Sequence, residues 1–234
     1  MIKKCLILLV LMACSLGAQA QGKRIKNNPR YDRKPIDFGF SIGLNYIDFR
    51  TRTLPDLGAD LPGYYRVYSE TSPGYTIRII SKFRLGDHWD LNFSPGYAFT
   101  LRTLRFDVLN QFTLNRELVE RQIESSFLEF PVYAKFRADR IGNYRLYLLA
   151  GPKYNLDLSS DQDVQDDRVF KLKRNEINYD LGIGVDLYFE FFKFSPQIIY
   201  SFGITNQKVD DDTFLAEGLD GIYTRALLIN FTFE

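Results

Sequence analysis

Large apolar side chains recur at every second position from Asp37 to the C-terminus, and no stretch of similar length repeats at the spacing of a helix. The segment from Trp89 to Leu101 shows this most clearly, because its odd positions are apolar and its even positions are small or polar. Successive side chains of a strand point to opposite faces, so the pattern predicts strands with one apolar and one polar face. The chain is therefore expected to be all-β.

Eight segments carry the alternation, and the lengths of their connections alternate too. The segments are residues 38–46, 75–85, 89–101, 128–136, 146–156, 177–189, 192–202 and 227–233. The short connections are Gly86–His88, Ala138–Asn143 and Glu190–Phe191, and the long ones are Thr51–Pro73, Thr103–Val119, Asp157–Asn175 and Asn206–Gly221. This layout predicts an eight-stranded antiparallel transmembrane β-barrel with short periplasmic turns, long extracellular loops and both termini in the periplasm.

The composition agrees with a membrane barrel, although the mean hydropathy is −0.21. A lipid-facing strand surface uses only every second residue, and beyond the N-terminus no run approaches the roughly 20 apolar residues of a membrane helix. A soluble eight-stranded barrel with its apolar residues inside is the alternative. Glycines on the polar face favour the membrane barrel, because so narrow an interior needs small residues beside long ones. They are Gly39, Gly43, Gly74, Gly96, Gly151, Gly182, Gly184 and Gly203.

The polar face also carries charges, which a narrow barrel must pair. The predicted interior holds Arg78, Lys82, Arg84, Lys135, Arg145, Lys153 and Lys193 with Asp90, Glu129, Asp180 and Asp186. Because an isolated buried charge is costly, we expect ion pairs that plug the lumen. A polar conduit is the alternative, but eight strands leave no channel of porin size.

Two features depart from the simple pattern. Prolines lie inside four of the predicted strands, at Pro95, Pro131, Pro152 and Pro196. A closed barrel has no edge strand to hold them, so each is expected to mark a bulge or a local break in pairing. The apolar residues Ile80, Leu149 and Ile199 fall on the polar face, so the interior is not uniformly hydrophilic.

Residues 1–20 have the features of a cleaved secretory signal peptide. A short basic start and an apolar stretch precede Ala18–Ala20, whose small residues suit a signal peptidase. The alternative is a lipoprotein box at Leu11–Cys14, with Cys14 lipidated. Cys5 also lies in this segment, so cleavage after Ala20 leaves no cysteine for disulfides or thiol catalysis.

A basic arm, residues 21–36, precedes the barrel domain at residues 37–234. Its charged residues are Lys23, Arg24, Lys26, Arg30, Arg33 and Lys34 with Asp32, six basic against one acidic, a net of +5. We expect a solvated periplasmic linker, and the alternative is a docking arm for an acidic partner or for lipid phosphates.

No residue is predicted to be catalytic or to bind a cofactor or metal. The single histidine, His88, lies in a predicted periplasmic turn, whereas a barrel hydrolase would need it at the outer rim. Aspartates gather at Asp161–Asp167 and Asp210–Asp212, but counting from Asp161 does not give the Gly and Glu that a calcium loop requires. We therefore expect a protein that is not an enzyme, has no cofactor and has no nucleic-acid partner.

An ordered set of segments resembles the PorT family, also called SprT. The segments are Phe38–Phe40, Gly43–Asn45, Asp48–Phe49, Phe127–Pro131, Lys171–Asn175, Phe192–Pro196, Ser201–Gly203 and Phe231–Glu234. They cover nearly the whole chain from about Lys34 to Glu234. The connection Thr103–Val119 departs from the family pattern, so no loop contact is carried over.

The resemblance implies a place in the type IX secretion system of the Bacteroidetes, which exports folded cargo across the outer membrane and supports gliding motility. It implies an accessory outer-membrane component that is required for export without being the main pore. Its expected partners are other type IX components in the outer membrane and periplasm, together with outer-membrane lipid. The alternative function is a general surface barrel, such as an adhesin, an envelope protein or a small-solute channel, unrelated to secretion.

Overall fold

The computed structural model describes residues 26–29, 31–53, 64–109, 115–160, 172–209 and 219–234. These residues form a short 3-10 helix, η2 (Tyr31–Arg33), and ten strands. The strands are β1 (Ile36–Thr53), β2 (Tyr64–Glu70), β3 (Ser72–Arg84), β4 (Trp89–Phe93), β5 (Gly96–Leu109), β6 (Arg116–Arg137), β7 (Tyr144–Asp157), β8 (Asn175–Tyr188), β9 (Lys193–Gly203) and β10 (Leu219–Phe233). No helix among them is long and apolar enough to cross a membrane. The predicted signal peptide lies outside the described residues.

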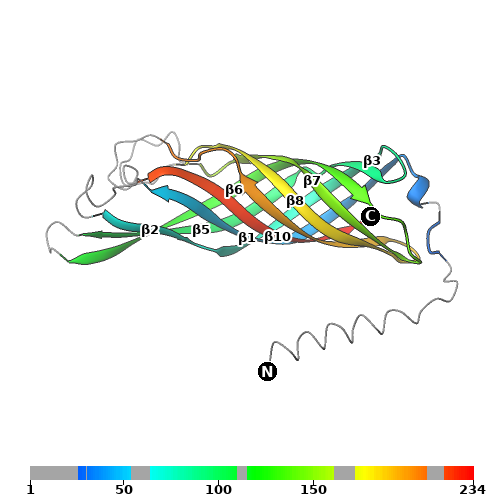
Figure 1. The fold of residues 1–234 in the computed structure, drawn as a ribbon, viewed down its shortest axis with the longest axis horizontal. Coiled ribbons are helices and arrows are strands. Elements are labelled where there is room, and N and C mark those ends of the chain that lie inside the picture. The colour runs from blue at the N-terminus through cyan, green and yellow to red at the C-terminus, as the bar shows by residue number, and fades with distance from the viewer. Residues whose placement is uncertain (1–25, 30, 54–63, 110–114, 161–171, 210–218) are drawn as a thin grey trace, which may run out of the picture.

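The strands close into one antiparallel barrel (Figure 1). Only Thr71 separates β2 from β3, and only Ser94 and Pro95 separate β4 from β5. Each pair is therefore one strand of the barrel with a short interruption. Joining these two broken pairs reduces ten strands to eight. β1 pairs with β3 on one side and with β10 on the other, which leaves the sheet without a free edge along β3. The prediction of an eight-stranded antiparallel barrel is confirmed.

The two ends of the barrel differ. The end that carries η2 and the C-terminus is joined by the connections 85–88, 138–143 and 189–192, and is called the short-turn end (Figure 1). The opposite end, where β1 and β5 finish, is called the long-loop end.

A belt of exposed apolar side chains surrounds the barrel. On β1, the outward residues from Ile36 to Tyr46 are all apolar and between 38% and 66% exposed. Ten residue steps of about 3.3 Å at a tilt of about 40° give a height of about 25 Å, which matches the apolar band of a membrane barrel. Aromatic pairs mark its two edges. The ring centroids of Trp89 and Phe136 are 5.0 Å apart near the short turns, and those of Tyr75 and Phe99 are 5.6 Å apart toward the long loops.

The prolines interrupt pairing locally without shifting the register. Pro95 lies in the gap between β4 and β5. Pro131 and Pro152 border a gap in the β6–β7 ladder, which pairs Pro131 with Lys153 and resumes at Ala134 with Ala150. The β8–β9 ladder is interrupted in the same way beside Pro196, although Pro196 still aligns with Phe231 of β10. The prediction of a local break at each proline is confirmed.

Two predicted connections are wrong in their extent. β5 continues to Leu109 and β6 begins at Arg116, so most of Thr103–Val119 is a paired hairpin, and β2 lies within Thr51–Pro73. β6 has 22 residues, about twice the number needed to cross a membrane, and its first half projects beyond the belt with β5 and β2 (Figure 1).

The projecting hairpin escaped prediction because its pattern is inverted. Leu104 and Phe106 are fully buried and face inward, while Arg105 between them faces outward. They join an apolar cluster inside the long-loop end: Phe49, Val67, Leu104, Phe106, Leu172, Leu219 and Ile222. Beyond the hydrocarbon the outer face meets water, so the apolar side chains turn inward as in a soluble barrel.

Inward glycines make room for large side chains, as predicted. A side chain added at Gly184 would collide with the ring of Tyr147, and one at Gly182 would collide with Leu149 and Ile199. Tyr147 and Leu149 of β7 therefore occupy the space beside these glycines of the neighbouring strand β8, which is how an interior this narrow is filled.

Candidate functional site: the charged interior and the arm that closes it

The half of the interior toward the short-turn end is lined by paired charges. Ten of the eleven predicted interior charges are buried there, at 9% exposure or less: Arg78, Lys82, Lys135, Arg145, Lys153, Lys193, Asp90, Glu129, Asp180 and Asp186. Arg84 is the exception, so that prediction is wrong. It lies at the last residue of β3, where it pairs with exposed Asp87 in the turn at 2.6 Å.

One chain of alternating charges links β3 with the neighbouring strands β6, β7 and β8, and passes over β4 and β5, which lie between β3 and β6. Arg78 of β3 donates to Glu129 of β6 from Nε at 3.0 Å and from Nη2 at 2.6 Å. Lys153 of β7 lies 3.5 Å from the second oxygen of Glu129 and 3.6 Å from Asp180 of β8. The Tyr133 hydroxyl donates to Asp180 at 2.5 Å. Each buried charge in this chain therefore has an oppositely charged partner on another strand. Because the partners must face each other, these contacts favour one register between the strands.

A second group gathers around Glu234, the residue that follows β10. Its carboxylate accepts from Lys82 of β3 at 2.8 Å and from Lys193 of β9. Lys193 also lies 3.8 Å from Asp186, which accepts from Lys135 at 2.9 Å. Residues from β3, β6, β8 and β9 therefore meet the residue that follows β10 in one network.

Six inward-facing charges with buried side chains were missed from the sequence: Asp37, Arg102, Arg137, Asp157, Glu176 and Glu234. Each continues the inward parity of its strand just beyond the predicted end of the segment. Arg137 pairs with Asp90 at 3.0 Å, and Arg102 lies 3.6 Å from Asp157. Extending the alternation by one or two positions would have found them.

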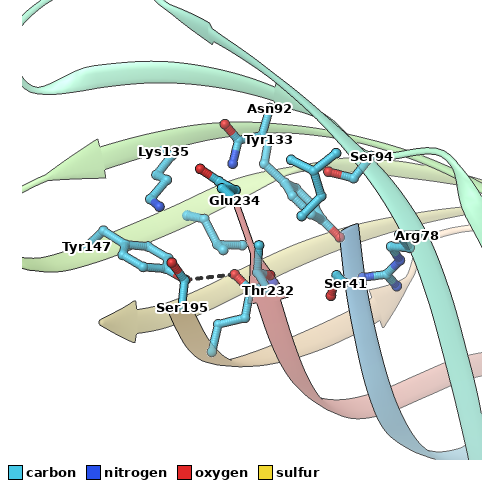
Figure 2. Close-up of a pocket in the computed structure, with 13 residues that line it drawn as sticks. Ser41, Arg78, Asn92, Ser94, Tyr133, Lys135, Tyr147, Ser195, Thr232 and Glu234 are labelled. Carbon is cyan, nitrogen blue, oxygen red and sulfur yellow. Dashed lines mark hydrogen bonds between the residues drawn. The ribbon is translucent and has the colours of Figure 1, made fainter. Parts of the chain in front are cut away.

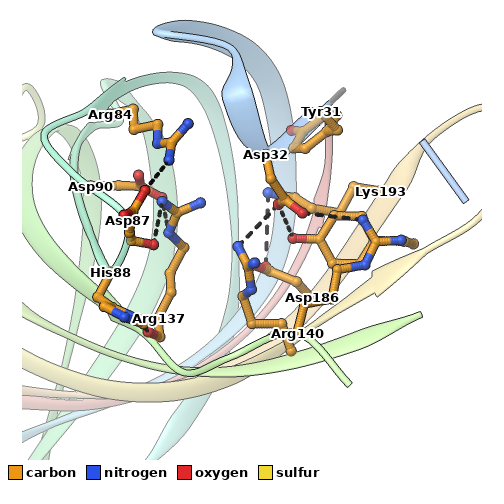
Figure 3. A network of polar contacts seen from close by, with 12 residues as sticks. Tyr31, Asp32, Arg84, Asp87, His88, Asp90, Arg137, Arg140, Asp186 and Lys193 are labelled. Carbon is orange, nitrogen blue, oxygen red and sulfur yellow. Dashed lines mark hydrogen bonds and ion pairs between the residues drawn. The ribbon is translucent and has the colours of Figure 1, made fainter. Parts of the chain in front are cut away.

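The described part of the basic arm closes the short-turn end (Figure 3). Asp32 of η2 accepts from Arg145 at 3.0 Å, from Arg140 at 3.2 Å and from the Tyr188 hydroxyl at 2.8 Å. The Tyr31 hydroxyl donates to Glu234 at 2.5 Å. The linker interpretation is wrong for this part of the arm, because η2 is fixed to the barrel by buried partners; residues 21–25 and Arg30 lie outside the described residues.

The contacts around η2 shift the pKa values of its two polar residues. Partial burial raises the pKa of Asp32, but the hydrogen bond from Tyr188 and the charges of Arg145 and Arg140 outweigh it and hold this pKa below 3.8. Burial, together with the charge of Glu234, raises the pKa of the Tyr31 phenol well above its ordinary value. At neutral pH, η2 therefore presents one carboxylate to two arginines and one neutral phenol to the Glu234 network.

An apolar layer lies across the middle of the barrel. It consists of Ile47, Tyr133, Tyr147, Leu149, Ile199, Ala226 and Leu228. Between this layer and the Glu234 network is a cavity of about 20 Å³, into which Tyr133 and Lys135 project from β6 and Glu234 projects from the end of β10 (Figure 2). About 10–15 Å³ is needed for one water molecule, so this cavity admits little more than that. Charges, a solvent-sized cavity and an apolar layer therefore occupy this part of the bore.

His88 lies in the turn between β3 and β4, at the short-turn end where the sequence placed it. Its Nδ1 is 3.0 Å from the carbonyl oxygen of Arg137, and its ring lies against Phe136. Within the described ranges, no three His, Cys, Asp or Glu side chains are grouped so that they could hold a metal. The aspartate-rich segments Asp161–Asp167 and Asp210–Asp212 lie outside those ranges.

Residues 19–208 match the model of the outer membrane protein β-barrel domain family. The chain belongs to this family. The exposed apolar belt of the barrel is therefore its lipid-facing surface, and the protein is a small β-barrel of the outer membrane. The finer assignment to PorT is treated below.

Several solved structures are similar to this chain at low sequence identity. Neisserial surface protein A shares 11% identity with a TM-score of 0.46, covering 85% of this chain and 98% of its own. The Yersinia pestis attachment invasion locus protein Ail, in complex with the heparin analogue sucrose octasulfate, shares 16% identity with a TM-score of 0.38, covering 86% and 99%. The N-terminal barrel of Pseudomonas aeruginosa OprF shares 14% identity with a TM-score of 0.34, covering 82% and 96%. No curated protein matches the sequence.

Proposed function

We propose that this protein is an accessory outer-membrane component of the type IX secretion system, required for protein export and the associated gliding motility, and acting through contacts. The ordered segments that resemble the PorT family support the link to secretion. The observation that carries the mode of action is the filled bore: a cavity of about 20 Å³ below an apolar layer cannot pass a polypeptide.

The proposed contact surface is the sheet that projects from the long-loop end. There β2, β5 and β6 pair beyond the lipid-facing belt, from Glu70 with Thr103 and Thr103 with Gln122 outward. Leu118 on this sheet is 51% exposed, although it lies outside the membrane. A rigid sheet with an exposed apolar residue suits protein contact better than a solvated loop does.

In the proposed orientation, the short turns and both termini lie in the periplasm and the projecting sheet lies outside the cell. The arm would then approach periplasmic components of the system. To test this, single cysteines are introduced at Arg116 and at Asp139, which lie at opposite ends and are both exposed. A membrane-impermeant maleimide should label intact cells at position 116 only, and labelling at position 139 only would reverse the orientation.

The second candidate is a general surface barrel, such as an adhesin or envelope protein. The same projecting sheet favours it, because a rigid external surface can bind a host or matrix molecule. A clean deletion distinguishes the two functions by comparing the medium and periplasm for cargo that carries C-terminal sorting domains. Loss of this cargo from the medium supports the secretion role, whereas an unchanged secretome with altered adhesion supports the surface barrel.

Complementation of the deletion then tests the contact surface. Replacing residues 107–118 by Asn-Gly keeps the Phe106–Val119 pair and the apolar cluster beneath it, and closes the hairpin with a tight turn. We expect this variant to assemble normally, with heat-modifiable gel migration, and to export poorly. A full-length Leu118→Ser variant separates the apolar contact from hairpin length. Normal export by both variants would refute the role of this sheet.

A further inference from the structure

We propose that the outer wall formed by β1, β9 and β10 at the long-loop end binds the phosphates of an outer-leaflet glycolipid, with Arg50 and Arg52 as the principal ligands. This inference rests on the proposed orientation, which places the long-loop end in the outer leaflet. It adds a specific lipid site to a barrel otherwise surrounded by lipid in general.

The position of the arginines is set by the end of the lipid-facing belt. On β1 the outward face is apolar up to Tyr46 and then changes to Asp48, Arg50 and Arg52. Four residue steps of about 3.3 Å at a tilt of about 40° place Arg50 about 10 Å beyond Tyr46. That distance corresponds to the headgroup layer, where lipid phosphates lie.

The two arginines of β1 are available for a ligand. The third arginine of this wall, Arg225 of β10, is occupied by Asp48, at 2.5 Å from Nε and 3.0 Å from Nη2. The guanidinium carbon of Arg52 lies 5.2 Å from the ring centroid of Tyr223, so this cation–π contact holds the Arg52 side chain against the outer wall. Within the part of the chain that the structure describes, neither Arg50 nor Arg52 forms an ion pair, so no described carboxylate compensates either charge.

The shape of the wall selects a lipid over a soluble anion. A groove of about 540 Å³ is lined by Arg50, Arg52, Tyr200, Phe202, Tyr223 and Arg225. A second hollow of about 440 Å³ shares Tyr200 and Arg225 with it and includes Tyr46 and Leu227 of the belt. A ligand with its phosphates on the arginines can therefore place an acyl chain against the apolar residues directly below. Arginine suits this task, because its fork of donors fits phosphate oxygens.

The experiment uses the refolded full barrel in detergent and native mass spectrometry to count bound lipid. The probes are bisphosphorylated lipid A, the same lipid after enzymatic removal of both phosphates, phosphatidylglycerol and inorganic phosphate. We expect lipid A to bind, and the dephosphorylated lipid to bind at least about tenfold more weakly, since each lost charge-assisted contact is of this order. Increasing salt should weaken lipid A binding, because the site is exposed.

The test variant is R50S/R52S and the matched control is R116S/R121S, which removes two positive charges from the projecting hairpin. Lipid A binding should fall about tenfold or more in the first and stay at the wild-type level in the second. Equal loss in both variants, no loss in R50S/R52S, or equal binding of the dephosphorylated lipid or of phosphatidylglycerol would overturn the site. Displacement of lipid A by an equal concentration of inorganic phosphate would also overturn it. The cysteine labelling measures the orientation and the clean deletion measures the secretion role, so failure of the lipid site is distinguishable from failure of either.

Discussion

Glu129 is the residue whose loss should most clearly reveal how the barrel interior is stabilised. It serves two cations, because Arg78 donates to one oxygen at 2.6 and 3.0 Å while Lys153 lies 3.5 Å from the other. Glu129→Leu leaves Arg78 without this partner and leaves Lys153 with Asp180 alone. Removing one member of a buried pair typically costs about 3–5 kcal/mol, and we expect the upper part of this range here.

The partner substitutions give a graded series. Arg78→Met should cost about 3 kcal/mol, because Glu129 keeps Lys153. The double variant R78M/E129L should cost about 1–2 kcal/mol, less than either single change, since an apolar pair replaces the ion pair and Lys153 keeps Asp180. These costs imply a coupling free energy of about 5–7 kcal/mol for this cycle, whereas independent sites would give a value near zero.

The measurement is urea unfolding of the barrel in lipid vesicles, followed by the fluorescence of Trp89, the one tryptophan in the chain. Asp87→Ser is the matched control, because its pair with Arg84 is also 2.6 Å long but leaves 87% of the Asp87 side chain exposed. It should cost no more than about 1 kcal/mol. If Glu129→Leu costs as little as the control, water solvates the interior and the polar conduit replaces the plug.

Two further predictions concern the bore and the arm. In a planar bilayer the folded barrel should carry no large stable current, even after removal of residues 21–34, because the apolar layer with Leu149 and Ile199 remains; large currents in the full chain would contradict the filled bore. The docking of η2 should depend on pH through Asp32, whose folded pKa lies below 3.8, so its contribution is complete above that value and is lost as pH falls through the folded pKa. A spin label at Lys26 should be immobilised at pH 7 and become mobile toward pH 2, with the Asp32→Asn variant lacking this transition; identical profiles for both proteins would exclude Asp32 as the cause.

Much of the fold follows from local pattern. A period of two fixes which residues share a face, and an even number of segments with alternating connection lengths implies a closed antiparallel sheet. The inward glycines and the proline breaks were also predictable, because steric room and the missing N–H of proline are properties of single residues. Ten of the eleven interior charges were placed correctly for the same reason, and the six that were missed needed only a longer reading of the same parity.

Other features needed the tertiary structure. Lys82 meets Glu234 across 152 positions of sequence, and Asp32 meets Arg145 across 113, so no local pattern could pair them. The inward turn of Leu104 and Phe106 depends on where the membrane ends, since the same alternation serves lipid outside or a core inside. The alternation in the sequence was thus enough to predict the eight strands of the barrel wall, their two faces and the closed sheet, but not the projecting sheet of β2, β5 and β6. Only the folded barrel decided which charges pair, where the apolar face reverses and that the arm seals one end, because these depend on the distances and solvent that closure creates.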